Sequence, residues 1–359
     1  MKQHKVLAMN FGSTSTKVAI YEGDREVILQ VFRHTPEEMS HIHTLEENAA
    51  FRKEVIMSYL KEHGVDLQEL DAIVGRGGLV KPIEGGTYLV GEEMLRDLHS
   101  CHYGFHVCNL GGILAAEIGE EIGKPAFVVD PPVVHEITEL ASLSGHPALV
   151  RRPLFHALNQ KAIAKRYADE IGKPYEELRL IVAHMGGGTT VGAHCGGKVV
   201  DVNNGLEGEG AFTGERSGGL TVLDVVRATL NGTFGSTYAE IRHNLCMKSG
   251  LVGYTGTNDG REISRRIAEG DKQAELAYRG MAYQVAKEIG AMGAVLQGRV
   301  DAILLTGGFA YDKTLMGWIE EYVSYLAPVR IYPGEDEMLA LAQGALRVLD
   351  GREEAKVYA

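Results

Sequence analysis

Three side chains able to handle phosphate charge lie beside glycine-rich segments of the chain. Arg76 stands in the segment GRGG, directly after a short apolar run, and Arg216 stands in GERSGG. His184 precedes three consecutive glycines. Arginine and histidine next to bare backbone N–H groups can neutralise a polyphosphate and stabilise a phosphoryl group in transfer. The pattern predicts phosphoryl chemistry; the simpler alternative is surface arginines and glycines that serve turn geometry alone.

Asp130 is a further candidate because of its position after a strand. It follows the apolar run 126–129, and the carboxyl end of a buried strand is a usual place for a catalytic or metal-linked carboxylate in α/β proteins. Pro131 comes next, so a turn former or a helix cap is the alternative interpretation.

Two similar hairpins would position these residues. Residues 180–200 have the pattern of a strand, a turn of three glycines and a returning strand. Residues 6–21 repeat it, with a turn rich in Gly, Ser and Thr and with Asn10 where the other copy has His184. The repetition indicates a duplicated α/β domain. We expect one hairpin in each half to grip a polyphosphate in a cleft between the halves, because glycine leaves backbone N–H groups open to phosphate.

Two more glycine-rich segments and one acidic segment follow. Residues 203–220 surround Arg216 and suggest a flexible loop that closes over substrate. TGGFA, residues 306–310, follows an apolar run and would suit a purine ring, a ribose or a phosphate. Residues 335–337 are Glu, Asp and Glu before the last predicted helix. They are either first-turn residues that favour the helix dipole or ligands of Mg²⁺.

Length and composition limit the other possibilities. A chain of 359 residues exceeds what one core usually supports, and the polar segment 142–153 with two prolines marks a boundary near residue 150. We expect an N-terminal domain of residues 1–150, completed by the C-terminal helix 337–359, and a second domain of residues 151–336. The net charge of −12 opposes nucleic-acid binding. Four cysteines without paired spacing indicate free thiols in the cytoplasm, and no apolar run is long enough for a membrane span.

Taken in order, these segments resemble one family. NFGSTSTK, GRGG, the strand ending at Asp130, HMGGGTTVG, GERSGG, TGGFA and YPGEDEM are similar to the acetate kinase and butyrate kinase family, within the actin-like, sugar-kinase and chaperone ATPase superfamily. The match runs from the first strand to the last helix. The length, GGG where acetate kinases usually have GNG, and PGEDEM resemble the butyrate kinase branch most. The resemblance implies duplicated actin-like, ribonuclease H-like domains, ATP and Mg²⁺ as cofactors, and homodimers.

The resemblance also implies a role for each candidate residue. Arg76 would bind the carboxylate substrate, and Asp130 would be the catalytic carboxylate. His184 would contact the phosphoryl group in flight, and Arg216 would stabilise it. Asn10 would help to place the metal and the phosphates. The implied nucleotide-binding residues are Asn10, Gly12, Ser13, Thr14, Ser15, Lys17, Gly186, Gly187, Gly188, Thr189, Gly307, Gly308 and Phe309.

The family's magnesium-linked glutamate falls within Glu335–Glu337, where Asp336 and Glu337 are both eligible. The implied reaction is reversible phosphoryl transfer between ATP and butyrate. An ionised carboxylate needs no general base, so Asp130 should orient Arg76, water or the metal. The alternatives are an acetate, propionate or isobutyrate kinase, a sugar kinase, and an actin-like ATPase without transferase activity.

Overall fold

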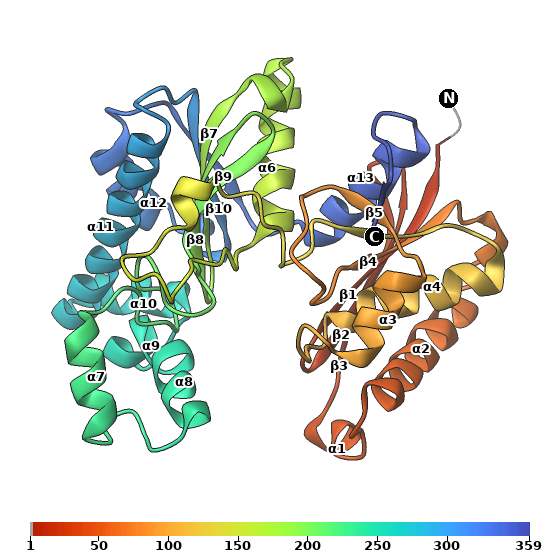
Figure 1. Cartoon of the computed structure of the whole chain (residues 1–359), viewed down its shortest axis with the longest axis horizontal. Coiled ribbons are helices and arrows are strands. Elements are labelled where there is room, and N and C mark those ends of the chain that lie inside the picture. Colours follow the sequence, from red (N-terminus) through yellow and green to blue (C-terminus); the bar gives the residue numbers. More distant parts are fainter. Residues whose placement is uncertain (1–2) are drawn as a thin grey trace. The chain divides into compact units, whose positions relative to one another are not determined.

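The computed structural model describes residues 3–359, which form two compact units, each built on its own sheet (Figure 1). The first unit contains the N-terminal residues up to Val134 together with Asp336–Ala359, and the second is His135–Glu335. Residues 135–150, expected in the N-terminal domain, are bonded to the second unit. The N–H of Thr138 donates to the Val200 carbonyl at 3.0 Å, and the Ala141 carbonyl accepts from Arg151 Nη1 at 2.6 Å.

The sheet of the first unit has the strand order β12-β5-β6-β4-β1-β2-β3. Strands β1, β2 and β3 form an antiparallel meander, and β4 and β6 continue the sheet parallel to β1. The strands are β1 (Lys5–Gly12), β2 (Ser15–Glu22), β3 (Arg25–Arg33), β4 (Ala72–Arg76), β5 (Thr87–Leu89), β6 (Ala126–Val129) and β12 (Lys356–Val357).

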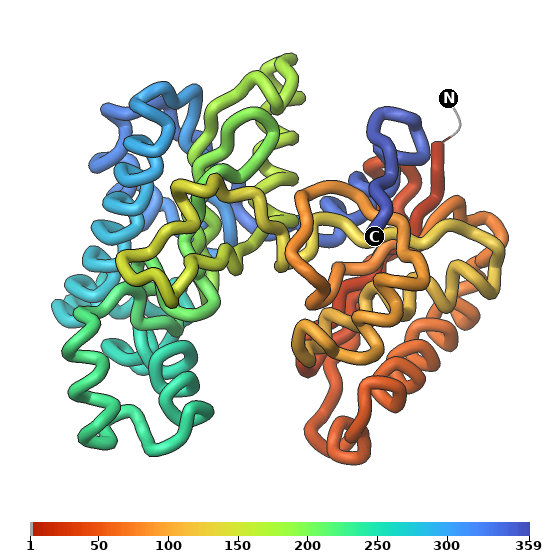
Figure 2. Tube along the Cα trace, in the orientation of Figure 1, coloured from red at the N-terminus to blue at the C-terminus, as the bar shows by residue number. Residues whose placement is uncertain are grey.

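Helices cover both faces of this sheet. They are α1 (Pro36–Met39), α2 (Leu45–Glu62), α3 (Glu92–Ser100), α4 (Asn109–Ile122) and α13 (Glu337–Leu349). Leu7 and Met9 of β1 join one core cluster with Ile56 of α2 and Ile113 of α4. Side chains alternate along a strand, so Ala8 and Asn10 face the other way, toward α13, which contacts β1. Figure 2 shows this C-terminal helix in blue beside the red first strands.

The second unit repeats the same arrangement. Its strand order is β11-β10-β7-β8-β9, in which β7, β8 and β9 are the antiparallel meander and β10 and β11 are parallel to β7. The strands are β7 (Arg179–Met185), β8 (Thr189–Cys195), β9 (Lys198–Val202), β10 (Ala302–Gly307) and β11 (Val329–Pro333). The order β3-β2-β1-β4-β6 of the first unit is its counterpart, so the predicted duplication is present.

Helices α6 (Ala157–Ile171), α11 (Lys272–Val295) and α12 (Lys313–Val323) pack on the second sheet. The other helices of this unit are α5 (Glu139–Ser142), α7 (Val222–Leu230), α8 (Tyr238–Met247), α9 (Gly250–Thr255) and α10 (Gly260–Ala268). Ile181 and Ala183 of β7 pack in the cluster of α11 and α12, whereas Leu180 and Val182 pack against α6. His184 therefore lies on the α6 face, as Asn10 lies on the α13 face of the first unit.

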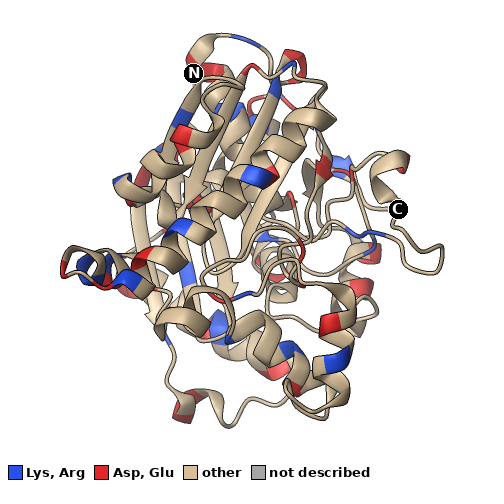
Figure 3. Cartoon of the chain, turned by 90° about the vertical axis from the view of Figure 1, so that its left-hand side faces the viewer, with Lys and Arg blue, Asp and Glu red and all other residues tan. Residues whose placement is uncertain are grey.

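Some elements have a clear local signal in the sequence. Helix α2 begins with a capping box formed by Thr44 and Glu47, which stand three residues apart. Short elements such as β5, β12 and α9 have no such signal, because they carry too few residues for a periodic pattern. Within residues 3–359 no helix combines the length and apolar character that a membrane crossing needs. Basic and acidic residues are interspersed along the helices (Figure 3), as where Arg265 contacts Glu262 at 2.8 Å and Glu269 at 2.5 Å.

Candidate active site

The predicted phosphate hairpin of the first unit is the β1–β2 turn. Gly12 pairs with Ser15, which leaves Ser13 and Thr14 as an exposed two-residue turn. Lys17 follows on β2 and is partly buried. The turn thus presents hydroxyls and backbone to solvent, as expected of an anion-binding turn.

A carboxylate of α13 joins two predicted site residues. Glu337 Oε2 accepts a hydrogen bond from Asn10 Nδ2 at 2.6 Å, and Glu337 Oε1 lies 3.0 Å from Arg76 Nη1. Asn10 is on β1, and Arg76 is the last residue of β4. Of the three acidic residues in sequence, only Glu337 makes this contact among the described residues. Asp336 is exposed at the N-terminus of α13, and Glu335 belongs to the second unit.

Asp130 is placed after β6 as predicted, with a left-handed backbone and φ of 39°. Its side chain is buried, and its Oδ1 accepts the N–H of Gly86 at 2.7 Å. Its own N–H donates to the Gly86 carbonyl at 3.1 Å. Asp130 therefore fixes the segment before β5, and the ion-pair partner of Arg76 is Glu337.

His184 ends β7 and is almost fully buried. Its Nδ1 lies 2.7 Å from Asn159 Oδ1, and Asn159 Nδ2 donates to the Glu335 carbonyl at 2.8 Å. Asn159 uses its Nδ2 for that carbonyl, so its Oδ1 is the acceptor and Nδ1 of His184 carries a proton. His184 Nε2 points toward Glu335, with 3.6 Å to Oε1. The His156 ring stacks on His184 with centroids 3.8 Å apart.

Arg216 lies against the glycine turn of the second unit. A Cβ added to Gly188 would meet Arg216 Nη1 at 1.6 Å. Nε and Nη1 of Arg216 are buried and make no hydrogen bond to any described residue. Burial lowers the pKa of Arg216, and Glu215 opposes this shift. A buried guanidinium with uncommitted N–H groups can accommodate an anion.

Hydrogen bonds anchor the loop that carries Arg216. Thr213 Oγ1 donates to the Gly187 carbonyl at 2.5 Å and accepts the Arg216 N–H at 3.0 Å. The N–H of Ser217 donates to the Leu245 carbonyl at 2.9 Å. The sequence suggested a flexible closing loop, whereas this part of it is tied to the glycine turn. The turn itself uses one amide internally, since the Gly186 N–H donates to the Gly188 carbonyl at 2.9 Å.

A pocket of about 850 Å³ opens beside the same turn. Its lining includes the predicted residues Gly186, Gly187, Gly308, Phe309 and Glu335. The sequence did not indicate the others, which are Asn258, Asp259, Gly260, Arg261, Ser264, Tyr311, Asp312 and Lys313. Its volume is that of a site for a small molecule or cofactor. Gly307, which ends β10, lies beside the turn, because a Cβ on it would meet the Met185 carbonyl at 2.3 Å. Thr189 Oγ1 is buried without a hydrogen-bond partner among the described residues.

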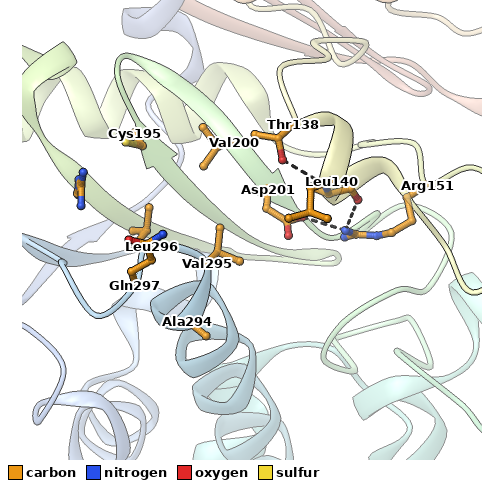
Figure 4. A pocket seen from close by; sticks show the side chains of 12 residues that line it. Thr138, Leu140, Arg151, Cys195, Val200, Asp201, Ala294, Val295, Leu296 and Gln297 are labelled. Atoms are coloured by element: carbon orange, nitrogen blue, oxygen red, sulfur yellow. Dashed lines mark hydrogen bonds and ion pairs between the residues drawn. The ribbon is translucent and has the colours of Figure 1, made fainter.

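A second pocket of the same unit, of about 620 Å³, has a different character (Figure 4). Its charged pair is internal, with Arg151 bonded to Asp201 at 3.1 Å and to the Ala141 carbonyl at 2.6 Å. Much of its wall is aliphatic: Leu140, Ala141, Val200, Ala294, Val295 and Leu296. It lacks a glycine turn, so the pocket beside Gly186 is the candidate nucleotide site.

Four residues that the sequence did not indicate contact the predicted site residues or their neighbours. They are Arg52, Asn159, His156 and Asn258. Asn258 Nδ2 donates to Glu215 Oε1 at 2.6 Å, beside Arg216. No local pattern marks them, because each acts on a residue far away in sequence. For Asn258, the segment TNDGRE signals only the start of a helix, and Asp259 does cap α10.

The chain is similar to known proteins in sequence and in fold. The sequence model of the Acetokinase family matches residues 126–316. The chain is 52% identical over 354 residues to Butyrate kinase 2 of Clostridium acetobutylicum, which covers 99% of both chains. Among solved structures, the acetate kinase of Porphyromonas gingivalis aligns with a TM-score of 0.78 and 20% identity, over 96% of this chain and 100% of that one. The ROK hexokinase of Thermus thermophilus aligns with a TM-score of 0.51 and 16% identity, over 96% of this chain and 99% of that one.

These matches confirm the predicted α/β fold of the actin-like and sugar-kinase type and the predicted family resemblance. At 52% identity over nearly the whole length, the chain belongs to the acetokinase family of acetate and butyrate kinases.

Proposed function

We propose that this protein transfers the terminal phosphoryl group of ATP reversibly to a short-chain carboxylic acid, with butyrate as the preferred acid. Membership of the family makes it a phosphotransferase with a carboxyl group as acceptor. In the forward direction a carboxylate oxygen forms a bond to the γ-phosphorus. The bond between this phosphorus and the bridging oxygen breaks, and ADP leaves with the electron pair. The acid is already ionised at neutral pH, so no base has to remove a proton from it.

The observation that carries the proposal is the Arg216 guanidinium beside the glycine turn. Its Nε and Nη1 are buried without partners among the described residues, which is unfavourable unless an anion binds there. The purine and ribose of ATP would occupy the pocket lined by Gly308 and Phe309. The phosphates would then extend along Gly186–Gly188, where Arg216 and His184 stabilise the equatorial oxygens of the transferred group.

The first unit would supply the groups for the acid and the metal. Arg76 would bind the carboxylate of the acid; its ion pair with the Glu337 carboxylate at 3.0 Å supports this role. Asp130 would also act at the catalytic centre. It follows β6, which pairs with β4, the strand that ends at Arg76. The Ser13–Thr14 turn would contact phosphate oxygens.

We propose Mg²⁺ as the metal. The described residues contain no group of three or more His, Cys, Asp or Glu side chains suited to a metal ion. Glu337 at the start of α13 would provide a carboxylate, and Asn10 of β1, which bonds it at 2.6 Å, an amide oxygen. This set fits Mg²⁺, which commonly takes one or two carboxylates and completes its shell with phosphate oxygens and water. When bound, Mg²⁺ would neutralise charge on the β- and γ-phosphate oxygens.

Trapping of the acyl phosphate with hydroxylamine tests this function. Purified protein with Mg²⁺ and ATP is offered acetate, propionate, butyrate, isobutyrate and valerate in turn. We expect the highest kcat/KM with butyrate and ADP formation that depends on the acid. Arg216→Ala should lower kcat by roughly 10²-fold or more, as loss of a transition-state donor does, with a smaller change in ATP affinity. ADP formation without any hydroxamate would refute the proposal, and a higher kcat/KM with another acid would replace butyrate.

We also propose a homodimer or a higher homo-oligomer. Helix α7 supports this, because none of its residues is buried and Val222, Leu223 and Leu230 are 74%, 67% and 82% exposed. Apolar side chains exposed together usually mark a contact surface. Light scattering of the purified protein measures the mass, and the mass of a monomer would overturn this expectation.

A further inference from the structure

A buried arginine lies behind the hairpin of the first unit. Arg52 of α2 has 0% exposure and is among the largest fully buried side chains. No Asp or Glu among residues 3–359 forms an ion pair with it. Removing a guanidinium from water is costly unless its N–H groups are bonded. Burial accordingly lowers the pKa of Arg52 to about 10.

Nearly all hydrogen bonds of Arg52 go to the β1–β2 hairpin. Nη2 donates to the carbonyls of Gly12 at 2.9 Å and Ser13 at 3.2 Å. Nη1 donates to the Ser15 carbonyl at 2.5 Å and to Thr16 Oγ1 at 2.9 Å. The remaining bond is from Nε to Asn48 Oδ1 at 2.6 Å, within α2. The guanidinium thus gathers carbonyls from both strands of the turn.

These bonds fix the direction of the turn amides. The C=O and N–H of a trans peptide unit point in opposite directions. The carbonyl of Gly12 shares its peptide unit with the N–H of Ser13, and that of Ser13 with the N–H of Thr14. The Thr14 carbonyl accepts the His34 N–H at 2.9 Å. Every carbonyl from residue 12 to residue 15 therefore has a protein donor, and the exposed side of the turn is left with N–H and hydroxyl donors.

The hydrogen-bond chain behind the turn is completed by His34. Thr16 Oγ1 accepts from Arg52 and lies 2.8 Å from His34 Nε2. Burial, followed by the charge of Arg52, lowers the pKa of His34, which favours its neutral form. Arg52 therefore supplies the positive charge in this chain of contacts.

We propose that Arg52 is a positioning residue for nucleotide phosphates: it holds the hairpin carbonyls inward so that the amides of Ser13 and Thr14 bind the polyphosphate, and its buried charge adds to the attraction. This inference rests on the proposed function. A positioning role predicts an effect on the binding of the phosphates and none on the binding of the nucleoside. If Arg52 only stabilised the fold, its loss would change the affinities for MgATP and for adenosine by the same factor.

Calorimetric titration with MgATP, MgADP and adenosine separates these roles. Arg52→Met keeps the length of the side chain but removes its charge and donors. We expect it to weaken binding of MgATP and MgADP by about tenfold, the value of one hydrogen bond to a charged group. Adenosine has no phosphate and should bind unchanged. Arg52→Lys should recover part of the MgATP affinity, because it restores a charge and fewer bonds.

Lys53→Met is the matched control. Lys53 is the next residue of α2, and it pairs with Glu117 at 3.0 Å and Glu121 at 2.6 Å, away from the hairpin. The Lys53→Met substitution removes a positive charge from the same helix and should leave the affinities for MgATP, MgADP and adenosine unchanged. Should Arg52→Met fail to fold, Arg52→Lys and Asn48→Ala, which frees Nε only, provide the same comparison with smaller losses.

Equal losses for adenosine and MgATP, or unchanged MgATP affinity in a folded Arg52→Met protein, would overturn the inference. The test measures binding and needs no turnover. If the protein formed no acyl phosphate, the proposed reaction would be refuted. If Arg52→Met nevertheless lost affinity for MgATP and MgADP but not for adenosine, the role of Arg52 would stand.

Discussion

A Cβ atom added to Gly188 would lie 1.6 Å from Nη1 of Arg216. The guanidinium occupies the space that any Cβ would need. Thr213 holds it there by bonding both the Gly187 carbonyl and the Arg216 N–H. The third glycine of the turn is thus required by a neighbouring side chain, whereas the sequence alone suggested that its role was to expose backbone to phosphate.

Gly188→Ala should disable catalysis by displacing Arg216. We expect kcat for acyl phosphate formation to fall by about 10²-fold or more, close to the effect of Arg216→Ala, because both remove the same donors from the phosphoryl group. Steady-state kinetics with butyrate and ATP measure this. Gly317→Ala is the control, since a Cβ there has no neighbour within 4 Å. A Gly188→Ala protein as active as Gly317→Ala would contradict the placement of Arg216.

Glu337→Gln should change the metal requirement. Glu337 contacts Asn10 at 2.6 Å and Arg76 at 3.0 Å, and the amide would keep the shape but lose the negative charge. We expect the Mg²⁺ concentration for half-maximal activity to rise by roughly tenfold, as for loss of a group that supports a metal site. Asp336→Asn is the matched control, because Asp336 is exposed and caps no N–H with its side chain. If Asp336→Asn has the larger effect, the assignment of Glu337 fails.

Gly307→Ala should destabilise the second unit. Gly307 has φ of 93°, and an added Cβ would lie 2.3 Å from the Met185 carbonyl. The left-handed backbone alone costs about 1–2 kcal/mol for a residue with a side chain, and the contact with β7 adds to it. We expect the melting temperature to fall by about 4 °C or more. Gly308→Ala should leave it unchanged, because no atom lies within 4 Å of its added Cβ. Differential scanning calorimetry compares the pair, and equal melting temperatures would refute the strain.

His194 should make the protein less stable in acid. It is fully buried, between Tyr175 at 2.7 Å and Gln160 at 3.0 Å. Burial, and then the charge of Lys161, lowers the pKa of His194 from 6.5 to about 3. The unfolded chain therefore takes up the proton first as the pH falls. Neutral His194 makes its full contribution to the free energy of unfolding above pH 6.5. This contribution is lost toward pH 3, by at most about 1.4 kcal/mol per pH unit.

Urea unfolding between pH 4 and 8 measures this loss against His194→Gln, which keeps a hydrogen-bonding side chain without a titrating group. The difference in unfolding free energy between the two proteins should be constant above about pH 7 and should shrink in acid. A difference independent of pH would show that His194 titrates as in the unfolded chain.

The sequence by itself determined the local features of this protein. Glycine turns, apolar strands and capping residues are specified within a few residues. Residues 6–21 and 180–200 could therefore be recognised as hairpins, and the periodic helices such as α2 and α11 could be placed. The order of the motifs also identified the family, since each motif is short and contiguous.

Only the tertiary structure decided which side chains meet. It placed Glu337 against Asn10, across 327 residues of chain. It placed Asn159 behind His184 and Arg52 behind the Gly12–Ser15 turn. The physical reason is that such contacts depend on which strand lies beside which and on which face of the sheet each helix covers. A local pattern carries neither, because burial and hydrogen-bond geometry arise when distant segments pack together.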